Sequence, residues 1–146
     1  MSDVVLLDAG PLGMISHPRV TSEVAAWLAG LVGAGVEVLI PEIADYEVRR
    51  ELLRAGRTKG VERLDDLKVT LGFVPITSKA MLRAAEFWAD ARRRGRPTAS
   101  DDSLDADVIL AAQAATLGAK GVIVASTNPR HVSRFVAAEY WQQIRG

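Results

Sequence analysis

Short, wholly apolar runs alternate along the chain with longer segments in which apolar residues recur every three or four positions. The runs predict strands buried on both faces, and the spacing of the longer segments is typical of amphipathic helices. We expect strands at 4–7, 36–40, 73–76 and 121–125. We expect helices at 21–31, 41 to about 55, 61–71, 77 or 78 to about 94, and 102 or 103 to about 117. This alternation predicts an α/β fold with a mostly parallel central sheet and helices on both faces.

The chain length of 146 residues suits a single domain, and no linker or repeat divides the range 1–146. No apolar run approaches the roughly 20 residues that cross a bilayer, and no signal-peptide pattern opens the sequence. Cysteine is absent, which excludes disulfides and thiolate zinc sites. We therefore expect a cytoplasmic protein without a membrane segment, in which oxygen or histidine ligands hold any metal ion.

Large apolar side chains on the predicted helices are candidates for the core. They are Met14, Trp27, Met81 and Trp88. No serine is accompanied by a recognisable base, so the sequence does not support a serine hydrolase.

The charged residues sum to zero net charge, yet they are strongly clustered. Three basic groups are Arg49, Arg50, Arg54, Arg57 and Lys59; Arg92, Arg93, Arg94 and Arg96; and Arg130, His131 and Arg134. An acidic group comprises Asp101, Asp102, Asp105 and Asp107. Basic patches around an acidic centre are typical of metal-dependent nucleases, because phosphate has to approach carboxylates that repel it. Taken singly, each cluster is more often a solvated helix face.

Two acidic residues in the first third of the chain occupy positions suited to a metal site. Asp8 follows the first predicted strand, at the edge where ligands bind in open α/β sheets, although it is also placed to cap the turn or helix that follows. Glu47 lies in the apolar stripe of its helix, four residues after Ile43. A buried carboxylate requires a positive partner, which is either a metal ion or Arg50 one turn further on.

Three polar residues in the last third of the chain extend this set. Asp107 lies on the apolar face of its predicted helix, level with Val108, and is a candidate metal ligand. Asp105 occupies the first turn, where an acid ordinarily caps the helix, and it is an alternative third ligand. Asn128 follows the last predicted strand, where it either contributes to the metal site or holds the Pro129 turn.

Four segments, in this order, resemble those of the PIN-domain family, and within it the VapC-like toxin ribonucleases of toxin–antitoxin pairs. They are Val4–Leu12, Pro41–Leu52, Asp107–Ala112 and Ser126–His131. The resemblance implies one PIN-like domain in which Asp8, Glu47 and Asp107 hold Mg²⁺ or Mn²⁺. Asn128 takes the fourth position, where many relatives carry an acid, which puts a second metal ion in doubt. Ser126 keeps the hydroxyl of the more usual threonine.

The same resemblance implies hydrolysis of RNA by in-line attack of water, leaving a 5′-phosphate and a 3′-hydroxyl. The expected RNA contacts are Arg49, Arg50, Arg130 and His131. It further implies a homodimer and a small antitoxin that inserts a basic side chain among the acids. Two alternatives remain open: an inactive PIN-like domain that binds RNA or a protein, and a phosphatase with Asp8 as nucleophile. The phosphatase is the weaker one, because Gly10 stands where such enzymes carry a second acid.

Overall fold

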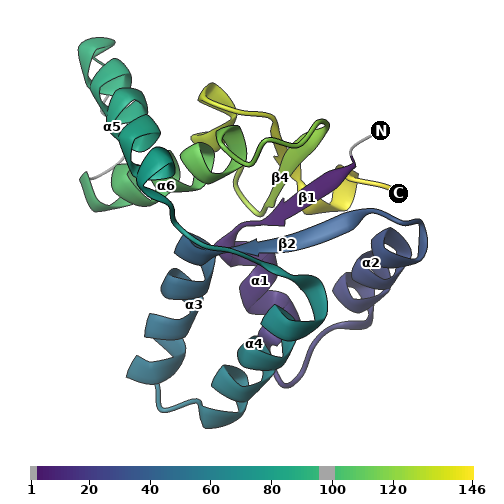
Figure 1. Cartoon of the computed structure of the whole chain (residues 1–146). Helices are drawn as coiled ribbons and strands as arrows, with labels where there is room; N and C mark the ends of the chain where they lie inside the picture. Colours follow the sequence, from purple (N-terminus) through teal and green to yellow (C-terminus); the bar gives the residue numbers. More distant parts are fainter. Residues whose placement is uncertain (1–2, 96–100) are drawn as a thin grey trace.

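The computed structural model describes residues 3–95 and 101–146, and the side chains of all of these except 101–103. Its centre is a five-stranded sheet in the order β3-β2-β1-β4-β5 (Figure 1). The strands are β1 (Val4–Leu7), β2 (Glu37–Pro41), β3 (Phe73–Val74), β4 (Val122–Ser126) and β5 (Ala138–Tyr140). Every neighbouring pair is parallel, which confirms the predicted α/β class.

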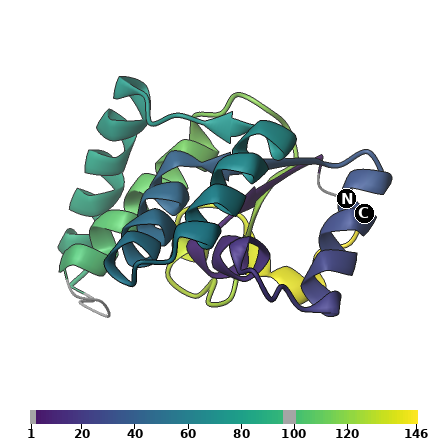
Figure 2. The ribbon, with the colours of Figure 1, turned by 90° about the horizontal axis from the view of Figure 1, so that it is seen from below.

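The helices cover both faces of this sheet, as predicted. They are α1 (Ala9–Ser16), α2 (Ser22–Gly33), α3 (Glu42–Arg54), α4 (Thr58–Leu71), α5 (Ser78–Arg93) and α6 (Asp101–Ala115). Side chains alternate along β1, so Val5 and Leu7 enter a core cluster shared with α1, α2 and α4, whereas Val4 and Leu6 enter one shared with α5 and α6. Figure 2 shows the sheet from the side of α1 to α4.

The sequence analysis did not assign helix α1 or strand β5. The sequence left open a turn or a helix after Asp8, and the chain forms helix α1 with Pro11 in the first turn, where a missing N–H is harmless. Strand β5 is only three residues long and half-exposed, and it forms by pairing with β4. Neither segment carries an apolar pattern long enough to predict it.

The core prediction is partly wrong for helix α5. Trp27 is buried and Met14 packs against the first cluster, but Met81 and Trp88 are 46% and 40% exposed. The buried stripe of α5 is instead formed by Ala80, Ala84, Phe87 and Ala91. Three of these four residues are alanines, which let α5 pack closely on α6. Met81 and Trp88 lie outside this stripe, on a neighbouring face of α5.

A buried glutamine fixes the start of α3, the helix that carries Glu47. The side chain of Gln113 accepts a hydrogen bond from the Ile43 N–H (3.2 Å) and donates one to the Val74 carbonyl (2.8 Å). The Glu42 carboxylate accepts a hydrogen bond from the Ile76 N–H (2.7 Å). These contacts join α3 to α6 and to the chain after β3, and they hold the helix at the carboxyl edge of the sheet. Within the described ranges, no helix is both long and apolar enough to span a membrane.

Candidate active site

Asp8 lies where β1 ends and α1 begins, and both oxygens of its carboxylate are engaged. Oδ1 accepts a hydrogen bond from the Ala9 N–H (2.7 Å), which caps α1, and Oδ2 accepts one from the Ser126 hydroxyl (2.7 Å). Burial raises the pKa of Asp8, because the loss of hydration outweighs these two hydrogen bonds. Asp8 is therefore a helix cap and, at the same time, a fixed, desolvated carboxylate at the edge of the sheet.

The neighbouring strand β4 supplies the support for Asp8. Ser126, its last residue, is buried, and its hydroxyl accepts a hydrogen bond from the Asn128 N–H (3.0 Å). Asn128 itself is exposed, and this backbone contact ties it to the turn. This contact involves the backbone of Asn128 and not its amide, so both interpretations of the side chain stay predictions.

Glu47 and Asp107 complete a cluster with Asp8, although they come from α3 and α6. The pKa of Glu47 rises to about 7, first through burial and then through repulsion from Asp8 and Asp107, against the attraction of Arg50. The pKa of Asp107 rises to about 6 through burial and repulsion from Asp8, against the attraction of Arg134. Charges act on one another in this way only at short range, so the structure brings the three predicted acids together.

The chemistry of this cluster fits a hard divalent cation. Its donors are carboxylate oxygens, which Mg²⁺ and Mn²⁺ prefer, and a cation would relieve the repulsion that raises the pKa values. The carboxylates do not form a complete coordination site. Among the side chains that the structure describes, no group of three or more acids or histidines is arranged to hold a metal ion. Without a cation the carboxylates repel one another, which keeps their oxygens apart.

Asp105, the alternative third ligand, lies away from the other acids. Asp105 is exposed and lines a groove between α5 and α6 together with Trp88. Asp107 is two residues further along the helix and therefore faces a different side. This placement does not support Asp105 as a ligand.

The four residues predicted to contact RNA differ in their exposure and in the side chains that surround them. Arg49 pairs with Asp45 within α3 (3.0 Å), and its pair with Asp65 (2.6 Å) joins α3 to α4. Arg50 is exposed, and its guanidinium lies 5.1 Å from the centre of the Tyr46 ring, beside Glu47. The remaining two residues, Arg130 and His131, follow β4. The pKa of His131 is lowered by burial and by Arg134 and Arg130.

A groove beside Glu47 runs between α1 and α3. It has a volume of about 550 Å³ and an apolar floor that includes Ala9, Val48 and Leu52. Its basic lining consists of His17, Arg50, Arg54 and Arg57. Its three arginines outnumber its two acids, Glu47 and Glu51, so the groove that adjoins the carboxylate cluster carries a net positive charge.

Sequence reasoning missed two contributions to this site. Arg134, in the short helical turn Val132–Arg134, acts on Asp107, but the sequence only assigned it to a basic group. Ser126 was noted for its hydroxyl, whereas its bond to Asp8 spans 118 residues of sequence and left no local signal.

No protein-family sequence model matches the chain, and no curated protein matches it in sequence. Solved structures do match over nearly the whole chain. FitAcB from Neisseria gonorrhoeae is 20% identical with a TM-score of 0.71, covering 96% of this chain and 99% of its own. VapBC2 from Rickettsia felis, solved with a DNA fragment from its promoter, is 13% identical with a TM-score of 0.72, covering 94% and 98%.

The chain has the PIN-domain fold. VapBC-1 from nontypeable Haemophilus influenzae agrees with this, at 14% identity and a TM-score of 0.71 over 96% of this chain and 99% of its own. The PIN-domain fold predicted from four short segments is thereby confirmed. At these identities the likeness establishes the fold, and the activity has to be argued from the site.

Proposed function

We propose that this chain is a divalent-metal-dependent endoribonuclease and the toxin of a toxin–antitoxin pair. The observation that carries the proposal is the mutual repulsion of Asp8, Glu47 and Asp107 at one edge of the sheet. Clustered, strongly perturbed carboxylates mark functional sites more often than structural ones. The structural neighbours are toxin–antitoxin complexes, which supports the same assignment.

The proposed reaction is hydrolysis of an RNA phosphodiester. Water attacks phosphorus, the bond to the 3′ oxygen breaks, and that oxygen takes up a proton, which leaves a 5′-phosphate and a 3′-hydroxyl. A Mg²⁺ or Mn²⁺ ion held by Asp8, Glu47 and Asp107 would supply positive charge at the reacting phosphate and make water a stronger nucleophile.

The protein's own residues prepare this reaction. Ser126 and the Ala9 N–H hold the Asp8 carboxylate in one orientation, so little reorganisation is needed when the site is used. The charge of Arg50 acts on Glu47, and the charge of Arg134 acts on Asp107. Their charge draws an anionic substrate toward acids that would otherwise repel it.

The basic groove between α1 and α3 is the proposed path of the RNA strand. Arg54 is paired with Glu51 at 2.8 Å, but both side chains are exposed, and a pair of this kind contributes little and exchanges readily for phosphate. Contacts of this type give affinity that falls steeply with salt and carries little sequence information.

The alternative of an aspartate-nucleophile phosphatase gains no support from the structure. Such an enzyme would need a second acid two residues after Asp8, where Gly10 packs directly on the Thr127 side chain. A side chain at position 10 would collide with Thr127, so this position cannot carry catalytic chemistry without moving α1.

The proposed partner is a small antitoxin. A basic side chain among the three acids would offset their charge as a metal ion does, and would thereby block the site. The neighbouring structures contain such partners, which supports the proposal.

A nuclease assay tests this function with Asp8→Asn and a matched control, Asp66→Asn, which changes an exposed acid on α4. We expect cleavage of single-stranded RNA that requires Mg²⁺ or Mn²⁺, stops in EDTA, and falls at least about 100-fold in Asp8→Asn. Asp66→Asn should keep its activity. Undiminished cleavage in EDTA, or by Asp8→Asn, would refute the proposal.

A further inference from the structure

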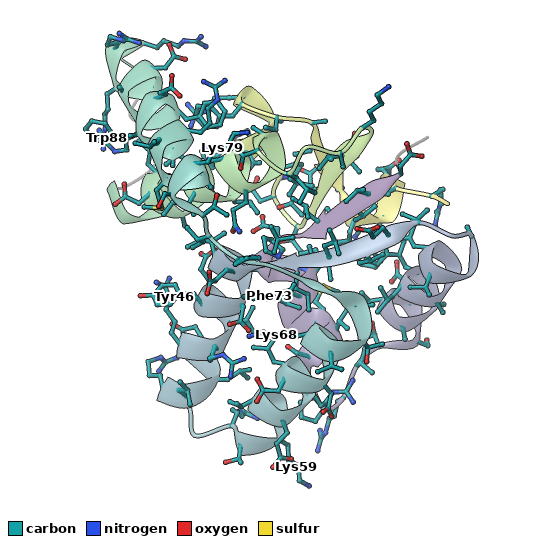
Figure 3. All side chains as sticks on the ribbon, in the orientation of Figure 1. Tyr46, Lys59, Lys68, Phe73, Lys79 and Trp88 are labelled. Carbon is teal, nitrogen blue, oxygen red and sulfur yellow. The ribbon has the colours of Figure 1, made fainter. Side chains whose placement is uncertain are left out.

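Helix α3 carries an exposed tyrosine next to the acid cluster. Tyr46 is 55% exposed, although it directly precedes Glu47 on a helix whose inner face is buried in the core. Figure 3 shows Tyr46 on the outer side of α3, away from Phe73 and Lys68. An exposed tyrosine beside a proposed active site is suited to contact a substrate, because its large, rigid ring loses little conformational freedom when it becomes buried.

Arg50 connects this ring to the acid cluster. It lies one turn further along α3, four positions after Tyr46 and three after Glu47, so its side chain can reach either residue. Its guanidinium lies over the Tyr46 ring, 5.1 Å from the ring centre, and its charge also acts on Glu47. The three residues therefore form a continuous surface that leads from an aromatic ring to a proposed metal ligand.

The basic groove between α1 and α3 reaches the same arginine. Arg50 lines this groove together with Glu47 and Arg54, whereas Tyr46 lies outside the lining. Arg50 therefore borders both the groove and the ring. A polynucleotide whose phosphates follow the groove past Arg50 would carry its next nucleotide to Tyr46.

The chemistry of the Tyr46–Arg50 pair fits a nucleobase. Bases stack on tyrosine rings and on guanidinium planes, and this stacking depends little on sequence because every base has a flat face. Arg50 lies over one face of the ring, and more than half of Tyr46 stays exposed, so a base has room to stack there. In a duplex the neighbouring base pairs already cover both faces of each base. The site therefore suits an unpaired nucleotide in a single strand, a loop or a bulge.

We propose that Tyr46 and Arg50 form a stacking site for one unpaired base next to the scissile phosphate. This inference rests on the proposed ribonuclease function and narrows its substrate class to RNA that is single-stranded at the cut. Tyr46 and Glu47 are consecutive, with Cα atoms about 3.8 Å apart, so the stacked nucleotide lies close to the cleaved bond. A base held at this point fixes the register of the strand over the acids, and such positioning contributes to the rate.

Substrates that lack a single base test this site. A single-stranded oligoribonucleotide of mixed sequence is cleaved in Mn²⁺, the cut is mapped, and each nucleotide around it is replaced in turn by an abasic ribose. We expect kcat/KM of the wild-type chain to fall about tenfold when one base beside the cut is missing. Tyr46→Ala should lose about tenfold on the intact RNA and nothing more on that abasic substrate, since both changes remove the same contact.

Two variants of α3 serve as controls. Tyr46→Phe keeps the ring and should retain at least about half of the wild-type kcat/KM, because stacking does not require the hydroxyl. Leu53→Ala removes a side chain that is 63% exposed on the same helix, and it should leave kcat/KM unchanged. Circular dichroism verifies that each variant folds.

A Tyr46→Ala variant as active as the wild type would overturn the proposal. So would a Tyr46→Phe variant no better than Tyr46→Ala, or an abasic loss that persists in full in Tyr46→Ala. A wild-type chain that cleaves no RNA would refute the proposed function instead. Fluorescence anisotropy of the same labelled RNA in EDTA then decides the inference separately: Tyr46→Ala should bind about tenfold more weakly than the wild type, and equal binding would overturn it.

Discussion

The carboxylate of Asp8 combines two roles that the sequence presents as alternatives. One oxygen caps α1 through the Ala9 N–H, and the other accepts the Ser126 hydroxyl. The sequence indicates the strand end and the cap, because both depend on adjacent residues. It does not indicate Ser126 as the partner, because that contact depends on β1 and β4 lying side by side in register.

Ser126→Ala tests the support of Asp8. The change leaves Asp8 Oδ2 and the Asn128 N–H without their hydrogen-bond partner, so we expect the free energy of unfolding to fall by about 1–2 kcal/mol. Nuclease activity should fall as well, because Asp8 is no longer held in one orientation. Urea denaturation measures the first effect, with Ser133→Ala as an exposed control. A fully stable and active Ser126→Ala would contradict this role.

The raised pKa of Glu47 predicts how stability depends on pH. Below its ordinary pKa of 4.5 the carboxyl is protonated in both the folded and the unfolded chain, so it has no differential effect. Between about pH 4.5 and about pH 7 the unfolded chain releases this proton while the folded chain keeps it, and above about pH 7 both chains are ionised. The metal-free protein should therefore lose stability from about pH 4.5 to about pH 7, with little further loss above that range.

Melting temperatures in EDTA measure this loss. Glu47→Gln should reduce the slope, whereas Glu62→Gln, on an exposed face of α4, should not change it. Mg²⁺ or Mn²⁺ should restore stability at the higher pH, because a bound cation compensates the charge. A melting temperature that rises over this pH range in EDTA would show that the acids are not mutually destabilising.

At the scale of elements, α3 was predictable and α1 was not. Pro41 and the apolar stripe mark the start and the buried face of α3, and the observed helix begins at Glu42 with Pro41 as its N-cap residue. Helix α1 contains Gly10, Pro11 and Gly13 within eight residues, and glycine lowers helix propensity. It forms because Leu12 and Ile15 are buried in the core, so packing overrides local preference.

Gly10→Ala tests why α1 tolerates such a sequence. A methyl group at position 10 would collide with the Thr127 side chain, so we expect α1 to shift and stability to fall by about 1–3 kcal/mol. Gly13→Ala is the matched control within the same helix, since its methyl group would meet Val48 at an ordinary 4.0 Å. That change should be neutral or stabilise by up to about 1 kcal/mol. Equal effects of both changes on the melting temperature would contradict the close approach of α1 to Thr127.

At the scale of the whole molecule, the parallel sheet explains why residues 8, 47 and 107 meet. The connections between parallel strands return the chain so that strand ends and the following helices gather at one edge of the sheet. The order and type of these positions were predictable from the sequence. The sequence and the resemblance also predicted that these acids repel one another, but not by how much, because the strength of the repulsion depends on where α3 and α6 place them relative to β1.

The central claim is that three acids from three elements form one divalent-cation site. A crystal soaked in Mn²⁺ tests it most directly, through the anomalous scattering of the metal. We expect an anomalous peak between Asp8 and Asp107, within reach of Glu47, and its loss in Asp8→Asn crystals treated in the same way. A soaked wild-type crystal with no peak at this position, or with the same peak in Asp8→Asn, would contradict the account.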